Sequence, residues 1–279
     1  ALRNPYQPYS DEEIEALKAS NAAGGILVLA GWSDYYESYE AFPAEDHMAA
    51  QQNKVLEALG SSLRIGDDAT NDDKLNGGQT QRLYFSTYNW DHFLMNGVEF
   101  DPENPNNNLY SQLFSQYGGA SIYVVDAEGN PTTTIPDTVS PVVYGHATTY
   151  SKDSDNDTLG GDSMPKYTVA EGDDRLMVLA TEDLGDDKGL IVVSGAAFMS
   201  NFEVQATIGD SGAEKNYSNY NICENLVNYL NPVAITPIKD VQAQKDEGIK
   251  YTIEGVVTSN ASGYDKDTAF FGCIYVQGD

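Results

Sequence analysis

Short apolar runs, bounded by glycine or by polar turn residues, are the feature that most constrains the fold of this chain. They occupy residues 26–30, 120–125, 176–180 and 190–194. Runs of this length are shorter than ordinary helices, and they lack the alternation of a strand with one wet face. The pattern therefore predicts strands that are buried on both faces of a sheet.

Helical patterns separate these runs. Ser10 and Glu13 can form a capping box that begins a helix, and Gly24 can end it. Further helices are expected at residues 45–59, 109–117 and 217–230. The alternation predicts an α/β fold with an open, mostly parallel, Rossmann-like (flavodoxin-like) sheet, helices on both faces and a short C-terminal β segment. The last two apolar runs are close enough for an antiparallel hairpin at one edge of that sheet.

The pattern changes between Pro232 and Pro237. We expect one α/β domain over residues 1–233 and a partial β domain over residues 238–279. Residues 251–258 alternate with period two, and residues 270–276 do so loosely, which indicates two strands joined by a loop. About forty residues are too few for a complete barrel, so this second domain is expected to be incomplete.

The balance of charges limits the partners of this chain. It carries 43 acidic and 15 basic residues in 279, a net charge of −28. Such a surface repels phosphate backbones and anionic lipids, so we expect no direct nucleic-acid binding by this segment. No apolar run is long enough to cross a bilayer, so membrane insertion is not expected either. The composition favours an extracellular protein, secreted or associated with a cell surface, and the opening Ala1 suggests a mature or excised piece.

Residues for nucleophilic or zinc chemistry are sparse. Cys223 falls inside a predicted helix, the wrong place for an exposed nucleophile, and the sequence has no G-x-S-x-G turn. Cys223 and Cys273 are read as two small buried residues, with a single disulfide as the alternative. The three histidines are scattered along the chain and no close Cys/His pair occurs, so neither a catalytic triad nor a transition-metal site is expected.

Calcium binding is the more specific prediction. The predicted ligands are carboxylates closely spaced in one loop: Asp153, Asp155, Asp157 and Asp162. Hard divalent cations bind six to eight oxygens on flexible loops, and alternate aspartates supply three at the start of one. The segment lacks the glycine and the closing glutamate of an EF-hand, so a solvated acidic loop is the equal alternative. A second cluster, which could add ligands, comprises Asp67, Asp68, Asp72 and Asp73.

Polar residues follow several predicted strands. In open α/β sheets, ligands bind beyond the carboxyl ends of the strands. The candidate ligand-binding residues at those ends are Trp32, Ser33, Asp34, Glu182, Asp183, Ser200, Asn201 and Glu203. Together they would suit a small polar or carbohydrate ligand. The alternative is that they are ordinary helix caps and turn residues, which favour loops for local backbone reasons.

Several segments resemble a known family. Residues 9–14, 31–35, 189–195 and 198–202 are similar to the class I glutamine-amidotransferase-like domains of large secreted, surface-associated bacterial proteins. Residues 254–260 and 274–277 resemble the opening of the OB-fold domains that precede endonuclease/exonuclease/phosphatase domains. The resemblance implies a Rossmann-like fold. The turns that would hold the amidotransferase cysteine contain none, so it also implies a catalytically silent domain without glutaminase activity.

These observations lead to a functional expectation with two alternatives. We expect a non-catalytic structural or ligand-binding module with no catalytic residues, inside a multi-domain secreted protein such as a nuclease or phosphoesterase. Its expected partners are other domains of the parent chain and a cell-wall or glycan ligand. The alternatives are a hydrolase that uses strand-end carboxylates and a glycan-binding module. Two carboxylates at catalytic separation, one of them with a raised pKa, would indicate the hydrolase. An aromatic platform, with Trp32 and Tyr35 or Tyr36 exposed together, would indicate the glycan-binding module.

Overall fold

The computed structural model describes most of the chain. The described residues are 2–3, 8–37, 44–156, 164–185, 188–204, 217–230, 236–243, 253–257 and 276–277. The chain divides into two compact units, Ala1–Leu226 and Val227–Asp279.

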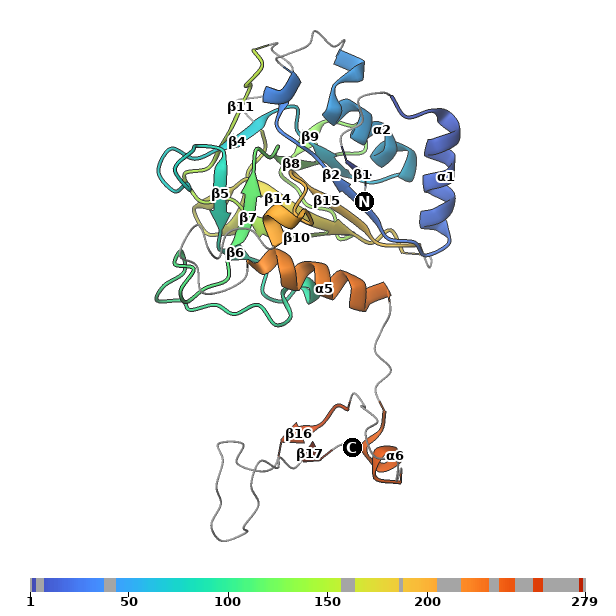
Figure 1. Cartoon of the computed structure of the whole chain (residues 1–279). Coiled ribbons are helices and arrows are strands. Elements are labelled where there is room, and N and C mark those ends of the chain that lie inside the picture. The colour runs from blue at the N-terminus through green and yellow to red at the C-terminus, as the bar shows by residue number, and fades with distance from the viewer. Residues whose placement is uncertain are drawn as a thin grey trace. The chain divides into compact units, whose positions relative to one another are not determined.

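The larger unit is built on a nine-stranded sheet (Figure 1). Its main path runs through β1 (Leu2–Arg3), β2 (Leu27–Ala30), β15 (Ile191–Ser194), β14 (Met177–Glu182), β10 (Val139–Tyr144) and β6 (Thr87–Tyr88). Off this path, β8 (Ile122–Val125) pairs with β14 and also with β3 (Leu63–Ile65) and β9 (Pro131–Thr132).

The strands of this sheet are mostly antiparallel. Only the pairings of β2 with β1 and with β15 are parallel among the described strands. The other pairings in this sheet are antiparallel. The prediction of an open, mostly parallel, Rossmann-like sheet is therefore wrong. A continuous apolar run shows that both faces of a strand are covered, but an antiparallel strand covered on both faces produces the same run.

One expected helix is absent, and its absence explains part of this error. Residues 109–117 do not form a helix; their last part is strand β7 (Phe114–Tyr117), antiparallel to β5 (Arg82–Phe85). Parallel strands need long, usually helical crossovers, and this segment does not supply one. The expected hairpin is confirmed, since β14 and β15 pair antiparallel with Leu179 opposite Ser194. The prediction that this hairpin lies at an edge of the sheet is wrong, because β10 flanks β14 on the side away from β15.

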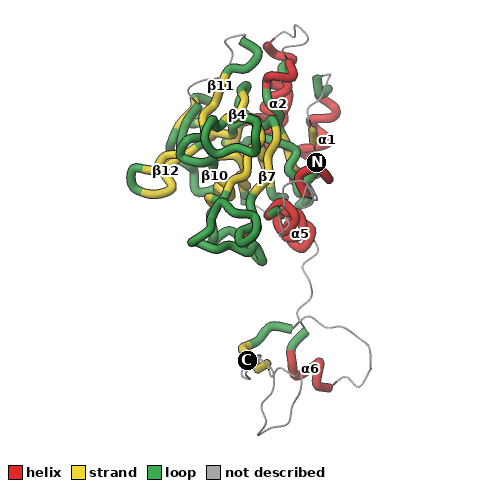
Figure 2. Tube along the Cα trace, turned by 60° about the vertical axis from the view of Figure 1, so that its left-hand side comes forward, coloured by secondary structure: helices red, strands yellow, loops and turns green. Residues whose placement is uncertain are grey.

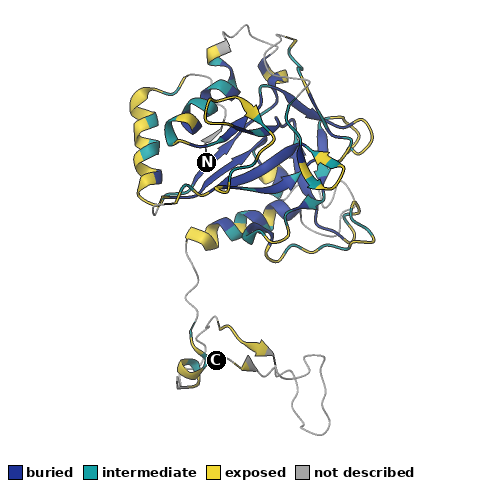
Figure 3. Ribbon diagram, turned by 180° about the vertical axis from the view of Figure 1, so that it is seen from behind, coloured by how far each residue is buried: buried dark blue, intermediate teal, exposed yellow. Residues whose placement is uncertain are grey.

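Alternate residues of the central strands enter two different hydrophobic clusters, one on each face of the sheet. Leu27 and Leu29 belong to the first cluster, together with residues of α2 (Met48–Leu59) and next to Leu17 of α1 (Asp11–Ala22). Val28 belongs to the second, which includes Ile222 of α5 (Ser218–Leu230). Figure 3 shows the buried strands between helices whose outer surfaces are exposed.

The helix ends follow local sequence rules. The predicted capping box is confirmed: Ser10 N–H donates to Glu13 Oε2 at 2.8 Å, and Glu13 N–H donates to Ser10 Oγ at 3.2 Å. Helix α2 begins at Met48 and stops at Gly60, whose φ of 77° is left-handed and favours glycine. The C-cap of α1 is Ala23, just before Gly24.

Smaller elements surround the sheet. Strands β4 (Ala69–Asn71) and β11 (Tyr150–Lys152) form an antiparallel pair, visible in Figure 2. Strands β12 (Tyr167–Ala170) and β13 (Asp173–Arg175) form another. The short helices are η1 (Asp34–Glu37), η2 (Ala44–Asp46), η3 (Phe93–Met95) and α3 (Asn201–Val204).

The smaller unit contains α6 (Ile238–Ala243) and an antiparallel pair of β16 (Val256–Val257) with β17 (Val276–Gln277). Most of the predicted strands at 251–258 and 270–276 lies outside the described residues, so the incomplete β domain stays a prediction. Across the part of the chain that the structure describes, no helix is both long enough and apolar enough to cross a membrane.

Candidate functional site

A short 3₁₀ helix, η1, follows the carboxyl end of β2. Side chains three residues apart share one face of a 3₁₀ helix, so Asp34 and Glu37 point the same way. Both are buried, with exposed fractions of 2% and 4%, whereas the intervening Tyr35 and Tyr36 are 49% and 37% exposed. The turn therefore presents two carboxylates inward and two phenol rings outward.

Asp34 meets two carboxylates of the loop after β11. Ligand oxygens of Asp34, Asp153 and Asp155 lie within 4.8 Å of one another. The Ser154 N–H donates to Asp34 Oδ2 at 2.7 Å, which fixes that loop against η1. Burial raises the pKa of Asp34 to about 6; the negative charges of Asp155 and Asp67 add to this, while the hydrogen bond from Ser154 opposes it.

Glu37 faces a second group of ligand atoms. His47, just before α2, places Nδ1 2.9 Å from Asp67 Oδ2 and 3.2 Å from Glu37 Oε2. The Met48 N–H donates to the other oxygen of Glu37. Burial is the main cause that raises the pKa of Glu37 to about 7; the negative charge of Asp67 acts in the same direction, and the hydrogen bond from the Met48 N–H opposes it.

Asp68 is a third buried carboxylate, next to Asp34 and Asp67. It is completely buried and accepts hydrogen bonds from the Ser121 N–H at 2.7 Å and the Ser121 hydroxyl at 2.6 Å. Its own backbone carbonyl accepts from Asp34 N–H at 3.2 Å. Burial raises the pKa of Asp68 to about 7, and Asp34 and Asp67 contribute in the same direction. The charges that raise these three pKa values are thus those of neighbouring carboxylates.

The predicted calcium ligands are only partly assembled from their own loop. Asp153 and Asp155 come together with Asp34, which was expected to serve a different pocket. Asp157 and Asp162 lie outside the described residues. Asp72, of the second acidic cluster, instead accepts hydrogen bonds from the Lys74 and Leu75 N–H groups and from two threonine hydroxyls, so it stabilises its own loop.

Glu37 and His47 were not foreseen as ligands. The expectation of no transition-metal site came from spacing along the sequence, where no second histidine or cysteine lies near His47. The three residues of this group come from η1, the start of α2 and the loop after β3. No local motif can reveal such a group, because only the fold brings it together.

Three of the residues proposed for the strand-end pocket lie together in the structure. Trp32, Ser200 and Glu203 line one cavity of about 300 Å³, together with Tyr117, Ala197 and Phe202. Ser33 is buried and directly precedes η1, and Asn201 is exposed at the start of α3. Glu203 is not available to a ligand, because both its oxygens lie 3.0 Å from Arg82 Nη1 and it also accepts from the Ser115 hydroxyl.

Glu182 and Asp183 lie at the opposite ends of the strands from Asp34. Glu182 ends β14, which is antiparallel to β15, and it pairs with Ile191; Ile191 in turn pairs with Leu27 at the start of β2. Glu182 is fully buried there and accepts from the Ser61 hydroxyl and the Ser62 N–H. The expectation that Glu182 lies near Asp34 assumed that β14 and β2 are parallel, so that their carboxyl ends would meet.

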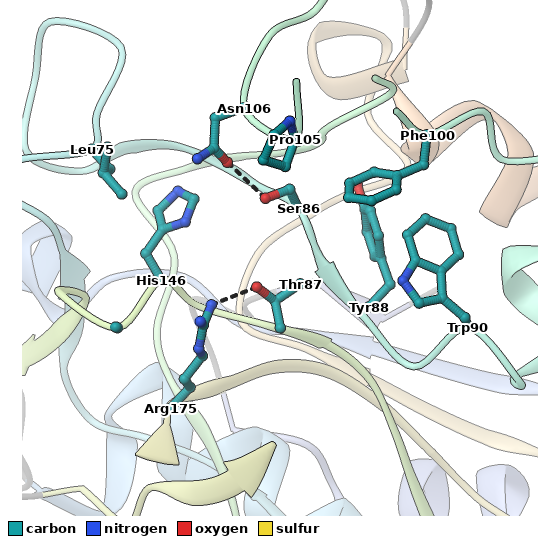
Figure 4. A pocket seen from close by; sticks show the side chains of 11 residues that line it. Leu75, Ser86, Thr87, Tyr88, Trp90, Phe100, Pro105, Asn106, His146 and Arg175 are labelled. Atoms are coloured by element: carbon teal, nitrogen blue, oxygen red, sulfur yellow. Dashed lines mark hydrogen bonds between the residues drawn. The ribbon is translucent and has the colours of Figure 1, made fainter. Parts of the chain in front are cut away.

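A second cavity, of about 400 Å³, has an aromatic wall and a polar wall (Figure 4). Tyr88, Trp90 and Phe100 form the first, with Trp90 4.9 Å and 4.8 Å from the other two ring centroids. Arg175, on the polar wall, donates to the Thr87 hydroxyl and, at 2.7 Å, to Asp173. Its positive charge is therefore neutralised within the protein.

Cys223 lies on α5, as predicted, and packs against the second hydrophobic cluster. Burial raises the pKa of its thiol to about 11, so very little thiolate exists near neutral pH. A buried thiol of this kind is a poor nucleophile.

Comparisons with known proteins assign no family. No family model matches the chain, and none of the curated proteins matches it. Among solved structures, one titled "mmIFT52 N-terminal domain" is similar at 14% identity and a TM-score of 0.45, covering 84% of this chain and 76% of that one. The expected membership in the amidotransferase-like family, with its following OB-fold, is therefore wrong: no family model supports it, and the sheet is mostly antiparallel.

Proposed function

We propose that this chain is a non-catalytic binding module whose site at η1 binds a divalent cation, with calcium as the best fit. The observation that carries the proposal is the convergence of Asp34, Asp153 and Asp155, from segments more than a hundred residues apart, with oxygens within 4.8 Å. Calcium binds carboxylate oxygens in flexible geometry and completes its shell with backbone carbonyls and water.

Electrostatics support the same proposal. Burying a carboxylate is unfavourable unless it is paired, and Asp34 is buried with other carboxylates as its main charged neighbours. A cation between them removes the repulsion that raises their pKa values. The strongly acidic chain also fits an extracellular setting, where calcium-binding modules of low affinity are common.

The raised pKa of Asp34, about 6, meets one half of the criterion for a hydrolase. A general acid does need such a pKa. The cation proposal explains more of the site, because a hydrolytic pair requires two carboxylates whereas Asp34 is joined by both Asp153 and Asp155. The hydrolase stays the alternative proposal.

The calcium proposal predicts a difference in thermal stability. A ligand that binds only the folded state at a hundred times its dissociation constant stabilises that state by about 2.7 kcal/mol. We therefore expect the melting temperature in excess calcium to exceed that in chelator by at least about 5 °C. Scanning calorimetry measures the difference, and Asp155→Asn should reduce it to near zero.

Asp91→Asn is the matched control, since it removes one negative charge from an exposed loop residue. It should leave the calcium effect intact. Coincident melting curves of the unmodified protein in calcium and in chelator would contradict the proposal, as would an undiminished effect in Asp155→Asn.

A second candidate function, glycan binding, is favoured by the outer face of η1. Tyr35 and Tyr36 are exposed, and the Tyr36 ring lies 4.5 Å from Trp32 and 5.9 Å from Tyr35 between centroids. Tyr35 and Tyr36 supply two rings of the aromatic platform expected of a glycan-binding module, and Trp32 is half-buried beside them. Sugar rings pack their apolar faces on such surfaces.

Glycan binding predicts a change in tryptophan fluorescence when soluble cell-wall oligosaccharides are added in the presence of calcium. Tyr35→Ala should weaken that binding at least about tenfold, a loss of about 1.4 kcal/mol. Tyr110→Ala is the control, because Tyr110 is also 49% exposed and lies elsewhere. Equal titration curves for the two variants would count against this candidate.

A further inference from the structure

The group formed by Glu37, His47 and Asp67 shares no residue with the proposed calcium site. We propose that it binds a transition-metal ion of the zinc class. The ligand atoms are His47 Nδ1, Glu37 Oε2 and Asp67 Oδ2.

The spacing of these atoms fits a tetrahedral ion. With metal–ligand distances of about 2.0–2.1 Å, neighbouring ligands of a tetrahedral zinc site lie about 3.3 Å apart. His47 Nδ1 lies 3.2 Å from Glu37 Oε2 and 2.9 Å from Asp67 Oδ2, and all three ligand atoms lie within 4.8 Å of one another. Only small shifts are needed to place one ion between them.

The state of Glu37 is an independent sign of a ligand. Its side chain is 3% exposed, and Oε2 is a buried oxygen that accepts no hydrogen bond within the described structure. The other oxygen is engaged by the Met48 N–H. A single proton on His47 Nδ1 can serve Asp67 at 2.9 Å, but it leaves Glu37 Oε2 without a donor. An ion bound to all three atoms satisfies that oxygen.

The types of ligand decide which ion fits. Imidazole suits zinc, cobalt and related ions, whereas calcium and magnesium prefer oxygen ligands only. Three protein ligands leave a fourth position for water or another group. The ligands are held by η1, by the residue before α2 and by the loop after β3, so ordered elements fix at least two of them.

Cobalt(II) is a suitable probe, because tetrahedral coordination gives it intense visible absorption. We expect the whole chain to bind one equivalent of Co²⁺ with these bands, and Zn²⁺ to displace it. His47→Gln should abolish the bands and weaken Co²⁺ binding in calorimetry by at least about a hundredfold, more than the loss of an outer-shell partner.

Glu37→Gln is the second variant, because its amide oxygen can still accept from the Met48 N–H and its NH₂ group, which does not bind a metal ion, replaces Oε2. It should fold, as judged by circular dichroism, and also lose the bands. Asp155→Asn and Asp91→Asn should leave Co²⁺ binding unchanged. The proposal is overturned if Co²⁺ does not bind with tetrahedral bands, or if the bands persist in folded Glu37→Gln.

The two metal proposals fail separately. Coincident melting curves of the unmodified protein in calcium and in chelator, with the Co²⁺ bands present, would refute only the Asp34 site. Loss of both the bands and Co²⁺ binding in Asp155→Asn would instead place the cobalt at the Asp34 group and overturn the site at His47.

Discussion

Replacing Arg82 with methionine is expected to lower the free energy of unfolding by about 3–5 kcal/mol. Arg82 and Glu203 are both buried, with side chains 8% and 6% exposed, and Nη1 lies 3.0 Å from each carboxylate oxygen. Removing the guanidinium leaves the Glu203 carboxylate buried with the Ser115 hydroxyl as its remaining donor among the described residues. The substitution also removes the guanidinium carbon that lies 4.6 Å from the centre of the Phe202 ring.

Urea denaturation of Arg82→Met, of Glu203→Leu and of the double variant measures this effect. Arg82→Met combined with Glu203→Leu should recover much of the stability, because two apolar side chains of similar volume replace the pair. A loss below about 1 kcal/mol in Arg82→Met would mean that the pair behaves as an exposed salt bridge.

Without divalent cations, the protein is expected to become less stable as the pH rises from about 4 to 8. The folded-state pKa values of Asp34, Glu37 and Asp68 are about 6, 7 and 7, above those of the unfolded chain. A group with a raised pKa stabilises the folded state fully below its unfolded pKa and loses that contribution as the pH rises through the folded value. For Asp68 alone, the shift corresponds to about 4 kcal/mol.

Melting temperatures measured in chelator across this pH range test the prediction. Asp68→Asn should flatten the profile, because the amide keeps an acceptor for the Ser121 N–H but does not ionise. Saturating calcium should reduce the slope that comes from Asp34. Stability that rises with pH through this range, in chelator, would show that these carboxyl groups are ionised in the folded state at low cost.

Much of the local structure could be predicted from the sequence. The capping box at Ser10 and the stop at Gly60 are decided by neighbouring residues, and both are present. The buried strands at 26–30 and 190–194 could be predicted because short, continuous apolar runs bounded by glycine favour strands covered on both faces. The direction of the strands could not be predicted, since it depends on the length and path of connections such as residues 109–117, where turn-forming residues and β7 replace the expected helix.

The site was predictable only where its residues lie together in the sequence. Asp153 and Asp155 were identified from their alternation, and Asp34 from its place after β2. Their meeting depends on the path of β11, which pairs with β4. His47 gave no signal, because its partners Glu37 and Asp67 lie ten and twenty residues away in other elements. Glu182 was misplaced for the same reason as the sheet: its strand runs in the opposite direction.

Because η1 is a 3₁₀ turn, the number of residues between Asp34 and Glu37 matters more for the site than which residues they are. With three residues per turn, each residue is rotated by about 120° from the last, so Asp34 and Glu37 are in phase while Tyr35 and Tyr36 are not. One inserted residue would turn a tyrosine toward the carboxylates and move Glu37 to the surface. Substitutions at Tyr35 or Tyr36 change only the outer face, so the segment should accept changes of residue type far more readily than changes of length.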